Sequence, residues 1–265
     1  MSRNRLGRPP AYLLLPAGLA VAMLLVPLAS LVARAPFGSL LERLAAPEVL
    51  DALWLSLWTA TAAMLASLVL GLPLAWLLAR VEFPGRSLVR TLVTVPLVLP
   101  PVVAGVALLT AFGRTGVIGA PLRELGVTIP FTSTAVVIAH TFVALPFFVI
   151  SVEGALRATS QDYDEVAAVL GARRGAIFRR VTVPLAAPGI AAGLVLGWAR
   201  SLGEFGATIT FAGNYPGVTQ TMPLAVYTLL QEDLEAAVAL SLVMLLVSVV
   251  VLALLRERWF GQAAR

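Results

Sequence analysis

The sequence predicts an all-α polytopic membrane protein with six transmembrane helices and both termini in the cytoplasm. Of its 265 residues, 59% are hydrophobic and 12% are charged, whereas soluble domains carry about 25% charged residues. Six apolar stretches each approach or exceed the roughly 20 residues that a helix needs to cross a bilayer. The arginines lie mainly in alternate connecting segments, as expected when cytoplasmic loops are the basic ones.

The N-terminal part is predicted to be a cytoplasmic N-terminus (residues 1–10) followed by a first transmembrane helix and an external loop (residues 11–50). Arginines before the apolar stretch Ala11–Val32 also fit a signal peptide. This stretch is longer than the roughly 7–15 residues of a signal-peptide core, and no clear cleavage site follows it. We therefore expect a retained first span.

Residues 51–255 are predicted to form the main transmembrane domain, and residues 256–265 a cytoplasmic tail too short to be a further domain. Within the domain we expect five more spans. They are Leu53–Ala79, Leu92–Phe112, Thr134–Val152, Leu185–Phe205 and Ala236–Leu255.

Prolines interrupt two of these spans: Pro96, Pro100 and Pro101 in the third, and Pro146 in the fourth. A proline in a span leaves backbone groups that neighbouring protein must satisfy. Two interpretations stay open, a packing kink and a bent helix that lines a pathway and moves.

Small residues recur every four positions in the fifth span, at Gly189, Gly193, Gly197 and Ser201. Such a stripe lets another helix approach closely. It indicates helix packing within the chain or, alternatively, a subunit interface or gate.

The arginines set the predicted orientation. With both termini inside, the inside segments hold fourteen of the nineteen arginines and the outside segments hold four, while Arg200 falls within the fifth span. This asymmetry is the one that the positive-inside rule describes. It places the segment 157–183 in the cytoplasm.

Composition excludes several kinds of site. The chain has no cysteine and a single histidine, His140, so we expect no disulfide, no metal site and no bound cofactor. It has no lysine and therefore no phosphate-binding loop of the G-x-x-x-x-G-K-[ST] type. The net charge is +5, but the arginines are dispersed between apolar stretches, so we expect contact with membrane lipid and not with nucleic acid.

The segment 157–183 is charged and amphipathic although it lies between two spans. We expect Thr159 or Ser160 to cap a short helix, with Asp162 in its first turn, and Gly175 to permit a turn. An ordinary interfacial helix is one interpretation. The small residues of this segment also allow another surface to approach its backbone.

The spacing of this segment, Glu-x-Ala-Ala-x-x-Gly-Ala followed by Phe178 and by Pro-Leu-x-x-Pro-Gly, resembles the cytoplasmic coupling loop of ATP-binding-cassette importer permeases. The resemblance implies the type I importer permease fold and a short helix that docks on an ATPase subunit. Val166 departs from the usual pair of alanines after the glutamate. The residues that match as ATPase-coupling positions are Asp164, Glu165, Ala167, Ala168, Gly171 and Ala172.

Two further stretches, Trp198–Gly217 and Gln220–Leu229, are similar to the molybdate permeases and more loosely to the sulfate permeases. The resemblance implies a permease subunit of a molybdate importer in the bacterial cytoplasmic membrane, working by alternating access. It implies no catalytic residue in this chain. Implied partners are two ATPase subunits that hold ATP and magnesium, an extracytoplasmic molybdate-binding protein and a second permease copy.

Three other interpretations stay open. Sulfate or tungstate is the alternative substrate, because the binding protein does most of the discrimination between similar oxyanions. An ion-coupled secondary transporter would need inverted repeats and buried carboxylates near the midplane, and only Glu204 is a candidate. An intramembrane enzyme would need paired catalytic groups, and this chain lacks them.

Arg200 and Glu204 are the charged pair expected at membrane depth. They stand four positions apart, so they can form an ion pair on a helix. They either fix the fifth span or release Arg200 to help admit an oxyanion. For His140, a satisfied interior histidine is the simpler interpretation. The residues expected along a translocation path or gate are Arg200, Ser201, Glu204, Pro100, Pro101 and Thr208.

The predicted outer end carries a turn, Asn214-Tyr-Pro-Gly217. An arginine-free acidic loop follows through Glu232, Asp233 and Glu235. The family resemblance implies that this loop meets the substrate-delivering protein.

Overall fold

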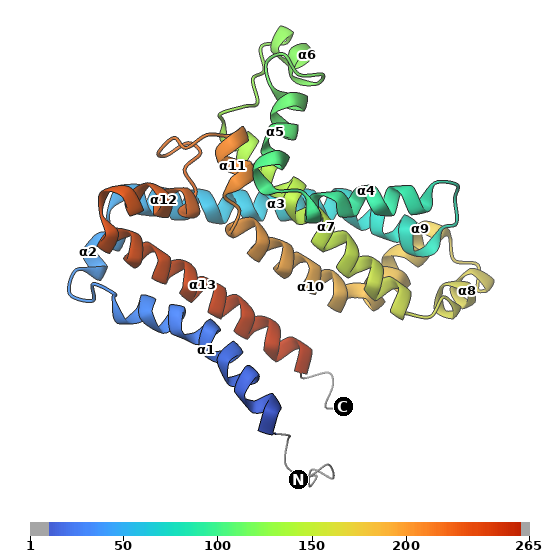
Figure 1. Cartoon of the computed structure of the whole chain (residues 1–265). Helices are drawn as coiled ribbons and strands as arrows, with labels where there is room; N and C mark the ends of the chain where they lie inside the picture. The colour runs from blue at the N-terminus through green and yellow to red at the C-terminus, as the bar shows by residue number, and fades with distance from the viewer. Residues whose placement is uncertain (1–10, 261–265) are drawn as a thin grey trace.

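We analysed a computed structural model of the chain, which describes residues 11–260. Every regular element in that range is helical (Figure 1). The elements are α1 (Ala11–Ala33), α2 (Leu40–Leu44), α3 (Pro47–Arg80), α4 (Arg86–Val98), α5 (Pro101–Phe112), α6 (Gly119–Glu124), α7 (Ser133–Ala158), α8 (Asp162–Val169), α9 (Arg174–Ile177), the π-helix η1 (Phe178–Thr182), α10 (Val183–Leu202), α11 (Gly206–Phe211), α12 (Met222–Glu232) and α13 (Leu234–Phe260).

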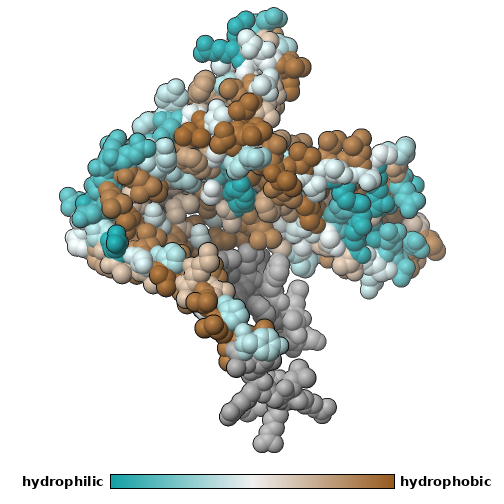
Figure 2. All heavy atoms as spheres, viewed as in Figure 1, coloured by the Kyte–Doolittle hydropathy of each residue, from teal (hydrophilic) through white to brown (hydrophobic). Residues whose placement is uncertain are grey.

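Five of the predicted spans are confirmed as long apolar helices. The helices long and apolar enough to cross a membrane are α1, α3, α7, α13 and the continuous stretch Arg174–Leu202 that ends in α10. Hydrophilic side chains gather near α12, near α8 and at the projecting tip near α6, with brown apolar surface between them (Figures 1 and 2). These three regions are therefore the ones expected to reach water.

The third predicted span differs from expectation. Leu92–Phe112 is not one continuous helix but parts of two, α4 and α5, whose axes meet at 118°. The reason is local: Leu99 and Pro100 both have extended backbone, with ψ of 129° and 135°. A residue before proline avoids the helical region, and neither Pro100 nor Pro101 has an N–H to continue the helix. The pair counts as a sixth span only if the bent unit crosses as a whole.

The main core lies between α3, α7 and α10. Phe148, Leu78 and Leu156 are its large buried side chains. The small-residue stripe of α10 faces this core. Gly189 lies against Ala155 of α7, and a Cβ added to Gly197 would lie 2.8 Å from the sulfur of Met64 in α3. The stripe thus packs helices of the same chain.

Two smaller clusters complete the interior. In one cluster, α5 packs closely on α11. A Cβ added to Gly105 would lie 2.6 Å from the Cβ of Thr210, and a Cβ added to Gly206 would lie 2.6 Å from the Cβ of Pro101. In the other, α12 and α13 pack near the start of α3 around Met222 and Leu240. The N-terminal helix α1 runs beside α13, and its large apolar side chains are exposed (Figure 1).

Candidate functional site

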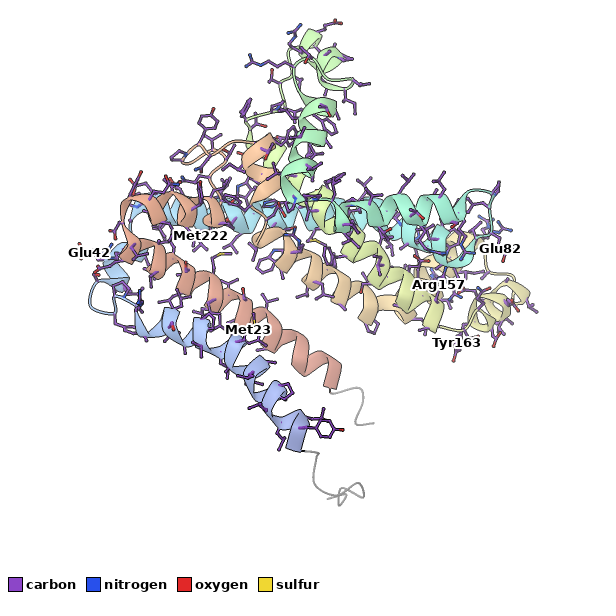
Figure 3. The ribbon with its side chains drawn as sticks, viewed as in Figure 1. Met23, Glu42, Glu82, Arg157, Tyr163 and Met222 are labelled. Atoms are coloured by element: carbon purple, nitrogen blue, oxygen red, sulfur yellow. The ribbon has the colours of Figure 1, made fainter. Side chains whose placement is uncertain are left out.

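The coupling segment (residues 157–183) forms α8, α9 and η1 at one end of the bundle. Tyr163 and Arg157 mark this end in Figure 3. The apolar side chains of α8 and its C-terminal turn point outward: Val166 is 59% exposed, Val169 87% and Leu170 81%. Exposed apolar groups in a row cost hydration free energy unless a partner covers them. Ile177 of α9, in contrast, is buried.

The boundaries of α8 follow from local chemistry. The Oγ of Ser160 accepts a hydrogen bond from the backbone N–H of Asp162 at 3.2 Å, although Gln161 occupies the N-cap position. At the other end Gly171 has a φ of +85°, which glycine adopts without a Cβ penalty. Gly175 lies inside α9, so the turn is made by Gly171 and the expected turn at Gly175 is wrong.

The coupling segment is held to two spans. The hydroxyl of Thr182, in η1, donates a hydrogen bond to the Asp164 carboxylate at 2.9 Å. The Arg80 guanidinium at the end of α3 lies 3.9 Å from the other oxygen of that carboxylate, and it donates to the carbonyl of Thr159 at 3.1 Å. Asp164 of α8 therefore contacts both the end of α3 and η1, which leads into α10.

Next to this connection, three arginines converge on the carbonyl oxygen of Leu78 near the end of α3. Arg86 donates to it at 2.6 Å, Arg90 at 3.3 Å and Arg157 at 3.4 Å. Cations are favourable at the C-terminal end of a helix, where carbonyl groups lack helical partners. Arg90 and Arg157 also pair with the buried Glu153 at 2.7 and 2.8 Å.

Sequence reasoning missed Glu153. Its spacing of four from Arg157 was the available signal. The contact with Arg90 joins residues 63 positions apart, which no local pattern reveals. Among the described residues, Glu153 is thus a second buried carboxylate beside Glu204.

At the opposite end of α10, Arg200 and Glu204 form the ion pair that their spacing indicates, at 2.8 Å. Glu204 is 1% exposed and lies just beyond the end of α10, not within a continuous helix. Its second oxygen accepts a hydrogen bond from the backbone N–H of Ala207 at 2.9 Å. Glu204 therefore links the end of α10 to the start of α11.

The other residues expected along a path fall into two groups. Pro100 and Pro101 are exposed at the α4–α5 break, and Pro101 touches Gly206 next to the Glu204 link. Ser201 and Thr208 are fully buried, and their hydroxyls have no hydrogen-bond partner. The structure thus brings Pro101 close to the charged pair, while it encloses Ser201 and Thr208 inside the chain.

His140 is 1% exposed, and within residues 11–260 neither of its ring nitrogens has a hydrogen-bond partner. A hypothetical Cβ on Gly197 would lie 3.6 Å from the carbonyl of Ala144. Because α7 and α10 are antiparallel there, one turn further along each helix brings His140 and Ser201 to the same level. Since its ring nitrogens have no partner among the described residues, His140 is not satisfied by direct protein contacts as we expected.

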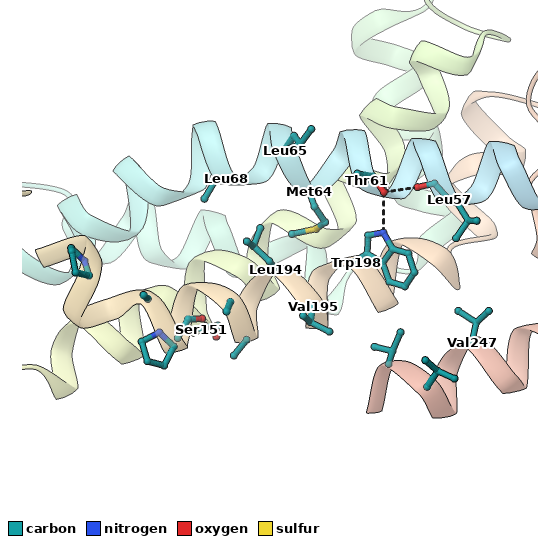
Figure 4. A pocket seen from close by; sticks show the side chains of 18 of the residues that line it. Leu57, Thr61, Met64, Leu65, Leu68, Ser151, Leu194, Val195, Trp198 and Val247 are labelled. Atoms are coloured by element: carbon teal, nitrogen blue, oxygen red, sulfur yellow. Dashed lines mark hydrogen bonds between the residues drawn. The ribbon is translucent and has the colours of Figure 1, made fainter. Parts of the chain in front are cut away.

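A cavity of about 1790 Å³ lies between α3, α10 and α13 (Figure 4). Its wall is mainly aliphatic. The indole N–H of Trp198 donates to the Thr61 hydroxyl at 3.2 Å, and that hydroxyl donates to the carbonyl of Leu57. Among the side chains that the structure describes, no charged one lines the cavity, so the described wall suits apolar chains and not an oxyanion.

The acidic loop at the far end is partly neutralised from within the chain. Arg43 of α2 pairs with Asp233 at 2.6 Å and with Glu235 at 2.8 Å. The N–H of Ala236, and then Arg43, hold the pKa of Asp233 below its usual value. The predicted turn before this loop is confirmed, with Gly217 at a φ of +70°. In residues 11–260 no cluster of acidic residues and histidine is suited to a metal ion.

Comparison with known proteins agrees with this geometry. The molybdenum transport system permease protein ModB of Mycobacterium bovis is 47% identical over 242 residues, covering 91% of this chain and 92% of the relative. ModB of Escherichia coli is 41% identical, covering 81% of this chain and 94% of the relative. The sulfate transport system permease protein CysT of Escherichia coli is 36% identical, covering 87% and 84%.

The fold is that of a solved importer. The crystal structure of a bacterial alginate ABC transporter, in complex with a pentasaccharide-bound periplasmic protein, has a TM-score of 0.75 over 93% of this chain and 92% of that chain, at 20% identity. The type I importer permease fold expected from the sequence is thus confirmed.

A family model described as the inner membrane component of binding-protein-dependent transport systems matches residues 67–258. The match includes the coupling segment, the ion pairs of Glu153 and Glu204, and the α4–α5 break. The chain is therefore a multi-pass inner-membrane transport component and not an enzyme. By this match, and by its identity to the ModB proteins, the chain belongs to the family of binding-protein-dependent transport system inner membrane components.

Proposed function

We propose that this chain is the membrane-spanning permease subunit of an ATP-driven molybdate importer that works by alternating access. The identity to ModB proteins supports molybdate as the substrate. The lower identity to a sulfate permease supports the assignment over its nearest alternative. ATP and magnesium belong to partner subunits in this proposal, because the chain has no lysine and hence no phosphate-binding loop.

The observation that carries the proposal is the exposed apolar face of α8 on a segment bonded to two spans. Its outward Val166, Val169 and Leu170 offer a surface for an ATPase, with Ala167, Ala168 and Gly171 permitting close approach. Asp164 then connects that surface to α3 and α10. An ATPase that binds one position of α8 more tightly than another would shift the equilibrium between conformations of the spans.

The assembly that we propose has two permease copies, two ATPase subunits and an extracytoplasmic molybdate-binding protein. The exposed apolar side chains of α1 support coverage by membrane lipid and by a second copy. The arginine asymmetry supports cytoplasmic termini, with α8 on the ATPase side. A reporter fused to the C-terminus should therefore be found in the cytoplasm.

Arg200 is the residue that we propose contacts the anion in transit. Its side chain is 31% exposed, so it can meet solute while still paired with Glu204. The pair also limits how tightly Arg200 holds an anion, which suits a conduit because a tightly bound ion would not be released. The exposed prolines of the α4–α5 break lie close enough to form part of the same path.

Two alternatives are weaker. Sulfate or tungstate import would use the same architecture with another binding protein. An ion-coupled secondary transporter would need a free carboxylate near the midplane, but among the described residues the buried Glu153 and Glu204 are both paired with arginines.

The test is uptake of labelled molybdate into vesicles that hold this chain with its ATPase and binding protein. We expect uptake that requires ATP and persists in excess sulfate. Uptake abolished by sulfate would assign the chain to sulfate transport. Uptake without ATP would contradict the importer proposal.

A matched pair of variants tests the role of α8. Val169→Asp places a charge on the proposed ATPase surface, and Val117→Asp places a charge on the loop before α6. The two valines are almost equally exposed, at 87% for Val169 and 88% for Val117. We expect Val169→Asp to abolish copurification of the ATPase and Val117→Asp to leave it intact. Equal behaviour of the two variants would remove α8 from the interface.

A further inference from the structure

The arginines at the α8 end of the bundle divide into two groups of four. Those of the first group donate hydrogen bonds to backbone carbonyls, and two of them also pair with Glu153; they are Arg80, Arg86, Arg90 and Arg157. Those of the second group are exposed, and within residues 11–260 their side chains have neither a hydrogen bond nor an ion pair; they are Arg173, Arg174, Arg179 and Arg180. The first group stabilises the fold, which leaves the second group to be explained.

Three of the free arginines surround a common cavity. The cavity has a volume of about 440 Å³ and is lined by Arg173, Arg179 and Arg180 together with Gly175 and Ala176. The glycine and alanine keep its floor open. Among the described residues no acidic one lines it, so three arginines border one small space without an acidic neighbour in its wall.

The helix geometry holds this cavity at the start of a span. Arg179 and Arg180 lie in η1, a π-helical turn that leads directly into α10. Pro184, in the first turn of α10, has no N–H to donate, and the hydroxyl of Thr182 is bonded to Asp164. The π-turn therefore has a structural cause, and its two arginines stand immediately before the apolar part of the span, where basic residues beside a span are expected to meet lipid headgroups.

We propose that this arginine cavity binds the phosphate group of an anionic phospholipid. A guanidinium matches phosphate oxygens with two parallel hydrogen bonds. Each arginine beside a span raises the affinity for an anionic lipid surface by about fivefold. Three arginines acting together should therefore bind an anionic lipid on the order of 100-fold more tightly than a zwitterionic lipid. The position at the base of α10 favours a lipid over a soluble anion, because the lipid is already concentrated there.

The test is binding of defined lipids to the full-length chain in neutral detergent, followed by native mass spectrometry. The probes are phosphatidylglycerol, phosphatidylcholine and inorganic phosphate. We expect wild type to bind phosphatidylglycerol about 100-fold more tightly than does the triple variant Arg173→Gln/Arg179→Gln/Arg180→Gln. Single variants should each lose about fivefold, which keeps the test decisive if the triple variant fails to fold.

A charge-matched control removes three other exposed arginines, in Arg34→Gln/Arg114→Gln/Arg123→Gln. We expect this control to bind phosphatidylglycerol as wild type does. Equal loss in both triple variants would reduce the effect to net charge and overturn the proposal. Inorganic phosphate that competes at equal concentration would identify a soluble-anion site instead. Unchanged lipid binding with loss of ATPase copurification would identify a surface for an acidic protein; either result overturns the lipid proposal.

Discussion

At the scale of single residues, Glu204 has two roles, as ion-pair partner of Arg200 and as hydrogen-bond acceptor for the start of α11. We expect Glu204→Ala to lower the free energy of unfolding by about 3 kcal/mol, the low end for breaking a buried ion pair, because Arg200 stays partly exposed. Glu204→Gln should cost less, since its amide oxygen can still accept from Ala207. Thermal unfolding in detergent measures both.

A double-mutant cycle separates the two roles. Adding Arg200→Gln to Glu204→Ala removes the unpaired charge, so it should recover part of the lost stability. If the double variant were as unstable as the sum of the single variants, the Arg200–Glu204 pair would contribute nothing beyond two independent contacts.

Sequence spacing predicted this pair but not its setting. The four-residue interval between Arg200 and Glu204 brings them together even though Glu204 lies beyond the last residue of α10. The contact of Arg90 with Glu153 could not be predicted, because it depends on how α4 packs against α7. Charged pairs within one helix are legible in a sequence, whereas pairs between helices require the fold.

At the scale of elements, glycines show which helix contacts are tight. A Cβ on Gly105 of α5 would lie 2.6 Å from the Thr210 Cβ of α11 and 2.9 Å from a backbone oxygen, whereas one on Gly154 of α7 meets nothing within 4 Å. We expect Gly105→Ala to destabilise the chain by about 2 kcal/mol through overpacking. Gly154→Ala should stabilise it by up to about 1 kcal/mol through helix propensity.

Thermal midpoints of the two variants in detergent check this prediction, and each is the control for the other because both sites are helical. Midpoints that move in the same direction would mean that α5 and α11 are not closely packed in the folded protein.

Element boundaries show where sequence reasoning reached its limit. Five spans were predicted as apolar helices, because apolar length determines their existence, but their ends were less certain. The helix α3 begins at Pro47 and not at Leu53, and α7 ends at Ala158 and not at Val152. The prolines of the third span did indicate a bend, but not that Leu99 and Pro100 would be extended and the axes would meet at 118°. The prolines determine where the helix breaks, but the angle follows from the backbone dihedrals at Leu99 and Pro100, which the sequence pattern does not specify.

At the scale of the whole molecule, α10 lies between two sets of polar contacts, those of Asp164 with Thr182 and Arg80 and that of Arg200 with Glu204. Its 20 residues span about 30 Å, with Thr182 and Asp164 beyond one end and Arg200 with Glu204 at the other. The coupling motif was predicted as a local pattern, but this connection through a rigid helix was not, since it depends on Thr182 and Arg80 meeting one carboxylate. We therefore expect motion of α8 to reach Arg200 through the Asp164–Thr182 hydrogen bond and along α10.

This arrangement predicts that Asp164 is needed to transmit motion and not to dock the ATPase. Asp164→Ala removes the bond to Thr182 and the charge beside Arg80. We expect ATP-dependent molybdate uptake to fall about fivefold, equivalent to a loss of about 1 kcal/mol of coupling, while ATPase copurification and ATP hydrolysis persist.

Asp162→Ala is the control, because that carboxylate occupies the same first turn of α8 but is exposed. Equal loss of uptake in both variants would mean that first-turn charge, and not the Asp164 connection, matters. Loss of the ATPase with Asp164→Ala would place Asp164 in the docking surface instead.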